Sequence, residues 1–156
     1  MEEEARSSQP DETVRRLDFS AFGKAIAQLE KSMAYCASEL ARHDPEIFKL
    51  FRAAAIQAFE FTYELSWKML RRYLEASLPN PAAVEEMSFP ELIRTGSERG
   101  LLLSGWDVWQ GYRKARGITS HTYDEARADQ VFAVIPEFLD EVRHLLAQLQ
   151  ERSFEP

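Results

Sequence analysis

Cysteine is nearly absent from this chain. Cys36 is the only one among 156 residues, so neither an internal disulfide nor a metal site built from several thiolates can form. A chain that uses no disulfide suits a reducing compartment. We therefore expect a cytoplasmic protein.

Long hydrophobic runs are also missing. No segment approaches the roughly 18 uninterrupted apolar residues that a membrane-spanning helix needs. The chain begins MEEEARSSQPDETVRR, which is polar and acidic, whereas an export signal is basic and then apolar. We expect no export signal and no membrane contact.

Positive charge is in short supply. The chain has 19 Lys and Arg against 26 Asp and Glu, a net charge of -7. Proteins that coat nucleic acid need a basic face, because their binding is driven by release of counterions from phosphates. The composition argues against that class, although Arg113, Lys114 and Arg116 lie together with no carboxylate between them and could form a small basic spot.

Strand patterns, hairpin dipeptides and internal repeats are lacking as well. The sequence predicts an all-α fold, an antiparallel up-and-down helical bundle of four long helices plus one short helix. The length suits one domain. We place the bundle at residues 18–151, between a disordered acidic tail at 1–17 and a C-terminal tail at 152–156.

Five helices are expected from the 3.6-residue apolar period and from capping residues. They run from Ser20 to about Arg42, from Asp44-Pro45 to about Ser77, from Ser88 to about Gly100, from Ser104 to about Gly117, and onward from a capping box at Thr122–Glu125. Leu40 is expected to end the apolar stripe of the first helix. We also expect Gly117 to adopt the left-handed conformation that often ends a helix, and Pro136 to kink the last helix.

A polar wedge crosses the second helix, which is otherwise apolar. At 100° per residue the wedge takes about a quarter turn, and its members are Gln57, Glu60, Glu64, Lys68 and Arg71. A helix so apolar is expected at the centre of the bundle. Glu60 and Glu64 are like charges one turn apart, a pair that favours a cation brought from elsewhere. The wedge is therefore either a solvated stripe with one Glu64–Lys68 ion pair or an anchor for a site residue such as Arg116.

The segment Arg116–Tyr123 is the best candidate for chemistry. Arg116 is expected at the end of one helix and His121 just before the next, so the turn places guanidinium and imidazole at the same end of the bundle. The positive N-terminus of the last helix would favour the neutral imidazole, which can accept a proton. A general base and a phosphate clamp suffice for metal-free RNA cleavage, in which a 2′-hydroxyl attacks the adjacent phosphodiester. The alternative is a structural loop with a helix-capping histidine.

Two segments of the chain resemble one known family. Residues 57–68 read QAFEFTYELSWK and residues 116–125 read RGITSHTYDE. Together they resemble the HEPN family, and within it the branch called nucleotidyltransferase substrate-binding proteins. The resemblance covers about residues 20–150.

The resemblance implies a helical-bundle homodimer in which the two loops meet at a shared cleft. It also implies a minimal nucleotidyltransferase as partner, in a toxin–antitoxin pair. By position, Arg116 and His121 match the ribonuclease motif of the family, and Tyr123 matches the tyrosine that the partner adenylylates to silence the toxin. The residue after the arginine is usually polar in the family, and here it is Gly117.

We therefore expect a metal-independent RNA endonuclease with no cofactor and no metal. The alternative is a non-catalytic subunit that presents substrate to the nucleotidyltransferase, and a third reading is a helical dimer with no nucleic-acid role. The chain is not expected to be the transferase itself. Where that enzyme class places its second metal-binding carboxylate, two residues after Asp107, this chain has Trp109.

Overall fold

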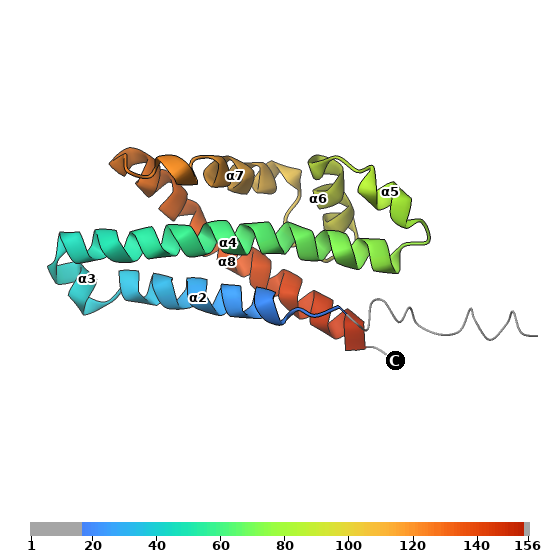
Figure 1. The fold of residues 1–156 in the computed structure, drawn as a ribbon, viewed down its shortest axis with the longest axis horizontal. Coiled ribbons are helices and arrows are strands. Elements are labelled where there is room, and N and C mark those ends of the chain that lie inside the picture. The colour runs from blue at the N-terminus through green and yellow to red at the C-terminus, as the bar shows by residue number, and fades with distance from the viewer. Residues whose placement is uncertain (1–16, 155–156) are drawn as a thin grey trace, which may run out of the picture.

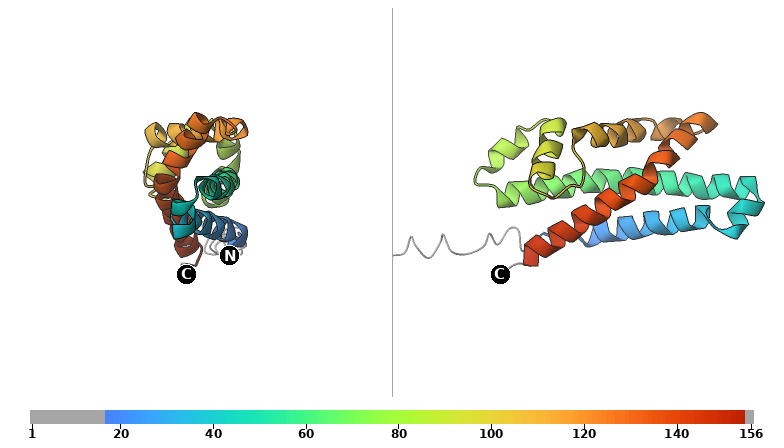
Figure 2. Two further views of the ribbon diagram at one scale, coloured as in Figure 1. Left: turned by 90° about the vertical axis from the view of Figure 1, so that its left-hand side faces the viewer. Right: turned by 180° about the vertical axis from the view of Figure 1, so that it is seen from behind.

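The computed structural model describes residues 17–154, and every regular element in that range is a helix. Figure 1 shows α2 and α4 side by side and antiparallel, with α5, α6 and α7 on the other side of α4. Seen from behind in Figure 2, α8 crosses the bundle diagonally. The predicted all-α bundle is confirmed. The helices within this range are α2 (Ser20–Cys36), α3 (Glu39–His43), α4 (Pro45–Ser77), α5 (Pro81–Glu85), α6 (Phe89–Glu98), α7 (Trp106–Gly117), the 3-10 helix η1 (Thr119–His121) and α8 (Glu125–Phe154).

Helix α4 is the central element, as its apolar circumference predicts. It contacts all of the other helices named above, including η1. Its N-terminus is capped by Asp44, whose carboxylate accepts hydrogen bonds from the backbone N–H groups of Glu46 and Ile47, and Pro45 occupies the first helical position. The predicted bounds of this helix are confirmed.

The first helix is shorter than expected. It ends at Cys36, and Ser38 then caps a separate short helix, α3. The Ser38 hydroxyl donates to the carbonyl of Tyr35 and accepts from the N–H of Ala41, so the side chain replaces the backbone bonds that would continue α2. The prediction that Leu40 extends the buried stripe is wrong, since Leu40 is 57% exposed.

Glycine and proline positions account for three further differences. Pro81 stops α4 from continuing but also starts the unpredicted helix α5, because proline fits the first helical position. Gly117 is an ordinary last residue of α7, so the left-handed conformation expected there is wrong. Among residues 17–154, positive φ occurs at Gly100, just after α6, where φ is 76°.

Gly96 is buried against Leu70, and an added Cβ would meet that side chain at 3.0 Å.

The core is centred on Phe138 of α8. Its ring packs against the rings of Phe59, Trp109 and Tyr112 at centroid distances of 4.9–6.2 Å. One carboxylate is buried beside this cluster. Glu141 is 1% exposed and accepts hydrogen bonds from the Trp109 indole N–H at 2.5 Å and from the backbone N–H of Ser104 at 3.1 Å. These bonds join α8 to the start of α7.

Helix α8 continues to Phe154, so its last turn includes three residues of the predicted C-terminal tail. Arg152 in that turn donates a hydrogen bond to the carbonyl of Arg99 at 2.7 Å. Pro136 lies inside the helix. The predicted N-terminal tail lies almost wholly outside the described residues. Among the helices of residues 17–154, none combines the length and the apolar composition that crossing a membrane requires.

Candidate functional site

The candidate site is the corner between α7 and α8. Arg116 lies in the last turn of α7, η1 follows, and α8 begins at Glu125. Backbone hydrogen bonds from Ile118 to Ala115, from His121 to Ile118 and from Asp124 to His121 make the corner a chain of tight turns. Arg116 and His121 are therefore held at the same end of the bundle.

The guanidinium of Arg116 is held by three side chains, and we call the four residues together the Arg116 cluster. Its Nε donates to Glu64 at 3.1 Å, Nη2 lies 3.2 Å from Glu60, and Nη1 donates to the Thr119 hydroxyl at 3.1 Å. Arg116 thus relieves the repulsion between two carboxylates one turn apart on α4, which is the contact that the wedge predicts. An arginine has five N–H donors, so one remains on each terminal nitrogen for a phosphate.

The other wedge residues behave differently. The Lys68 ammonium lies over the Trp67 ring, 5.6 Å from its centroid. The Glu64–Lys68 ion pair of the solvated-stripe alternative is not among the ion pairs of residues 17–154, because Glu64 pairs with Arg116. Gln57 is exposed.

His121 and Tyr123 face solvent at this corner. Both side chains are exposed, Tyr123 to 83%, and their rings meet edge to face with centroids 6.3 Å apart. Tyr63, the residue before Glu64 on α4, is buried, and burial raises its pKa to about 12, so its hydroxyl stays protonated near neutral pH. His121 is the accessible candidate for a base.

The predicted capping box at Thr122 is wrong. The carboxylate of Asp124 caps α8 by accepting hydrogen bonds from the N–H groups of Ala126 and Arg127, while the Thr122 hydroxyl donates to the carbonyl of Thr119. A carboxylate therefore occupies the N-terminus of α8.

Two contributors to the corner are absent from the sequence predictions. One is Thr119, whose hydroxyl also donates to the carbonyl of Arg116 at 2.8 Å and so joins both ends of the turn. The other is Arg52, with a side chain 7% exposed, which pairs with Asp129 at 2.6 Å and with Glu125 at 2.8 Å. The hydrogen bond from Arg52 lowers the pKa of Glu125 below its ordinary value. Arg52 is an ionisable residue in the apolar sector of α4. A charged residue at such a position indicates a buried ion pair, and the sequence alone could have shown this.

Within residues 17–154, no three His, Cys, Asp or Glu side chains lie close enough together to hold a metal ion. The corner presents one oriented guanidinium, one exposed imidazole and one exposed phenol. Such a set can bind a phosphate, accept a proton and receive a covalent group.

Comparison with known proteins assigns the chain to a family. The profile of one family, described as "Nucleotidyltransferase substrate binding protein like", matches residues 17–151. The chain belongs to this family. The predicted membership of the nucleotidyltransferase substrate-binding branch of HEPN is thereby confirmed.

Individual members of the substrate-binding family agree with this assignment. A Haemophilus influenzae protein named "Probable ribonuclease HepT" is 43% identical over 101 residues, which cover 65% of this chain and 68% of the relative. A solved Haemophilus influenzae structure, described as the fold of a substrate-binding domain of a nucleotidyltransferase, is 33% identical with a TM-score of 0.79. The match covers 85% of this chain and 99% of that one.

A second solved structure extends the comparison to another organism. A Thermus thermophilus protein is 32% identical with a TM-score of 0.62, and the match covers 82% of this chain and 98% of that one. The helical bundle is therefore the architecture that this chain shares with both solved structures.

Proposed function

We propose that this chain is a metal-independent RNA endonuclease that acts with a minimal nucleotidyltransferase in a toxin–antitoxin pair. The observation that carries the proposal is the guanidinium of Arg116, held by Glu60, Glu64 and Thr119 beside the turn that exposes His121. The name of the Haemophilus influenzae relative, a probable ribonuclease, supports it. A cytoplasmic location is part of the same proposal and rests on the single cysteine.

The reaction needs only groups present at the corner and water. The imidazole of His121 takes the proton of a 2′-hydroxyl, and the 2′-oxygen attacks the neighbouring phosphorus. Arg116 stabilises the charge that develops on the phosphoryl oxygens. The bond from phosphorus to the 5′-oxygen breaks, and that oxygen takes a proton from water, giving a 2′,3′-cyclic phosphate and a 5′-hydroxyl. The hydroxide left by the water takes the proton back from the His121 imidazolium, which restores the neutral imidazole.

The test is to incubate the full chain with RNA in the presence of a chelator and to analyse the ends of the products. A cyclic phosphate at one end and a hydroxyl at the other is the expected result. Intact RNA, together with tight binding to the nucleotidyltransferase, would favour the alternative of a non-catalytic substrate-binding subunit. The description of the Haemophilus influenzae structure as a substrate-binding domain supports that alternative.

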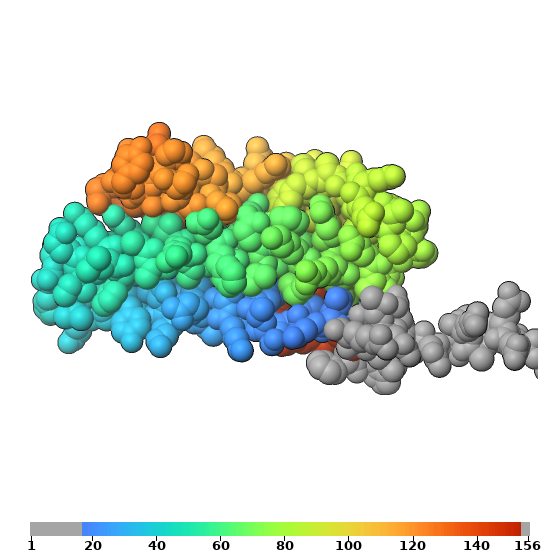
Figure 3. Space-filling model, viewed as in Figure 1, coloured from blue at the N-terminus to red at the C-terminus, as the bar shows by residue number. Residues whose placement is uncertain are grey.

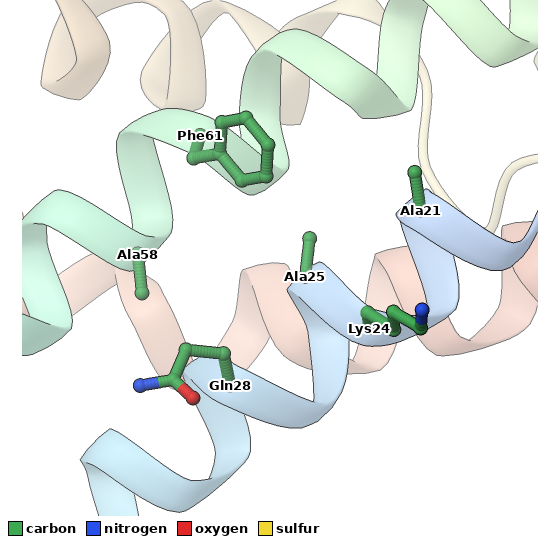
Figure 4. A pocket seen from close by; sticks show the side chains of 6 residues that line it. All are labelled: Ala21, Lys24, Ala25, Gln28, Ala58 and Phe61. Carbon is green, nitrogen blue, oxygen red and sulfur yellow. The ribbon is translucent and has the colours of Figure 1, made fainter.

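A homodimer is part of the proposal, and the face formed by α2 and α4 is its candidate interface. A groove of about 280 Å³ lies there, and Figure 4 shows the side chains that line it. Four of these residues are apolar and two are polar, and the full set is Ala21, Lys24, Ala25, Gln28, Ala58 and Phe61. Phe61 is 59% exposed and lies one turn from Glu64, so a second copy seated here would lie next to the Arg116 cluster.

Phe61→Glu is expected to weaken this dimer at least about tenfold, because a charge replaces an apolar anchor in the contact. Sedimentation equilibrium measures the dissociation constant. Leu103→Glu is a matched control, since Leu103 is similarly exposed but lies between α6 and α7. An equal effect of both substitutions, or a monomeric unaltered chain, would contradict the interface.

Adenylylation of Tyr123 completes the proposal. The exposed phenol oxygen would attack the α-phosphate of ATP, with loss of its proton and release of pyrophosphate. Co-expression with the partner nucleotidyltransferase is expected to add one or more adenylyl groups to the chain, as intact-mass spectrometry would measure. Tyr123→Phe is expected to remove the added mass, whereas Tyr35→Phe, at another exposed tyrosine, should retain it. An unmodified wild-type chain after co-expression would count against this regulation.

A further inference from the structure

A second cluster, made of cations and aromatic rings, lies where α4 and α7 meet, next to the Arg116 cluster. Its aromatic members come from three helices and form a row in which Trp67 meets Phe89 at 6.2 Å and Phe89 meets Trp106 at 5.7 Å, both edge to face. Figure 3 shows the surfaces of α4 and α7 meeting along one face of the molecule.

Three cations lie over the faces of these rings. Arg71 and Lys68 lie 5.2 and 5.6 Å from the centroid of Trp67, and Arg113 lies 5.1 Å from the centroid of Phe89. We call the three cations and the three aromatic residues the basic–aromatic row. A cation held over an aromatic ring is attracted by the π electrons and is partly oriented before any ligand arrives.

The charges of the row are not neutralised by carboxylates of the described chain. Among the ion pairs of residues 17–154, none involves Lys68, Arg71 or Arg113, and the buried Nε of Arg71 has no hydrogen-bond partner within that range. Among these three cations and Arg116, only Arg116 has carboxylate partners within the described range, namely Glu60 and Glu64, although the protein has a net charge of -7. Such a local excess of positive charge attracts a polyanion.

The row adjoins the candidate site along both helices. Arg113 lies one turn before Arg116 on α7, and Lys68 lies one turn after Glu64, which holds Arg116. A phosphate held by Arg116 would therefore have further cations one helical turn away in the direction of α6. That is the arrangement that a backbone of successive phosphates requires.

We propose that the basic–aromatic row binds the RNA backbone beside the phosphodiester that Arg116 holds. This inference rests on the proposed endonuclease function and adds the path of its substrate. The row supplies affinity by phosphate neutralisation and takes no part in the chemical step.

The experiment measures binding without cleavage. A fluorescent 2′-O-methyl oligoribonucleotide keeps every phosphate but lacks the attacking hydroxyl, so it can be titrated with the full chain in chelator at several salt concentrations. In the Lys68→Gln/Arg113→Gln variant the dissociation constant is expected to rise at least about tenfold. The slope of log affinity against log salt should fall by about 1.4, because each phosphate contact to a single strand contributes roughly 0.7.

Two matched variants serve as controls. Arg42→Gln/Arg99→Gln removes the same charge from exposed positions in α3 and after α6, and it should leave affinity and slope within about twofold. Lys68→Arg/Arg113→Lys keeps the charge and should restore binding. If the glutamine double variant fails to fold by circular dichroism, the single Lys68→Gln variant decides, with an expected slope change of about 0.7.

Three outcomes would overturn the inference. The first is an unchanged slope in the glutamine double variant, and the second is a wild-type chain that does not bind the oligonucleotide. The third is unchanged RNA binding with loss of nucleotidyltransferase binding, which would make the row a protein docking site. Cleavage by the Arg116 site is measured separately with ordinary RNA, so the endonuclease proposal can stand when this inference fails.

Discussion

RNA cleavage by the His121→Ala variant is expected to be at least about 100-fold slower than cleavage by the unaltered chain, because a positioned general base contributes that much or more. Arg116→Ala should cause a loss of similar size, since it removes the charge that stabilises the transition state. Rates are measured with a single RNA in chelator under single-turnover conditions.

Arg116→Lys tests the geometry of the clamp. Lysine keeps the charge but loses the forked donors that bind Glu64, Thr119 and a phosphate together, so most of the activity should still be lost. Ser120→Ala, an exposed position between Thr119 and His121, should cleave within about twofold of the unaltered chain. Equal cleavage by all of these variants would show that the activity does not arise at this corner.

Glu64→Ala should have a smaller effect, of about tenfold. One charge-assisted hydrogen bond to Arg116 is lost while Glu60 and Thr119 still hold the guanidinium, and tenfold corresponds to about 1.4 kcal/mol. Glu64→Gln keeps an acceptor for the Arg116 Nε and should recover most of the rate. If glutamine and alanine are equally impaired, Glu64 does not act by orienting Arg116.

The Glu141→Ala variant is expected to lose about 3 kcal/mol of unfolding free energy. The substitution leaves the Trp109 indole N–H and the Ser104 backbone N–H without their acceptor, and each unsatisfied buried donor costs about 1–3 kcal/mol. Urea denaturation measures the change. Glu137→Ala, an exposed position on the same helix, should stay within about 0.5 kcal/mol of the unaltered chain.

The same carboxylate predicts a pH dependence of stability. Burial raises the pKa of Glu141 above its ordinary value of 4.5, so the folded state holds this proton more tightly than the unfolded state does. The contribution of Glu141 to stability is therefore largest below pH 4.5 and falls as pH rises through the folded pKa. The difference in unfolding free energy between the unaltered chain and Glu141→Gln should shift against the unaltered chain over that range. A constant difference would contradict the assignment.

Local signals predicted helix boundaries well where the side chains left one choice. Helix α4 starts at Asp44 and Pro45 because Asp44 supplies the cap. It ends at Ser77 because the prolines that follow cannot continue a helix. Prediction failed where two local outcomes compete. The Ser38 hydroxyl could have hydrogen-bonded back within a continuous helix, and only the fold shows that it starts α3.

The candidate site was likewise predicted only where neighbouring residues of the sequence determine the outcome. Repulsion between Glu60 and Glu64 predicted that a cation would come to them, and Arg116 does. The roles of Arg52 and Glu141 depend on which helices face them, and one-dimensional spacing carries no such information. Each nevertheless interrupts an apolar stripe, which is the trace that a buried charge leaves in a sequence.

The length of α4 sets the distance between the two sides of the corner. Arg52 fastens the start of α8 and Glu64 fastens the end of α7, and the two anchors are twelve residues apart on one rigid rod, about 18 Å by helical rise. Inserting one residue between them would turn one anchor about 100° away from the other and separate the two sides of the loop. Inserting seven would restore the phase but add about 10 Å, more than the short connection between α7 and α8 could span without rebuilding. The length of this helix segment is thus as tightly constrained as the identity of the residues that it carries.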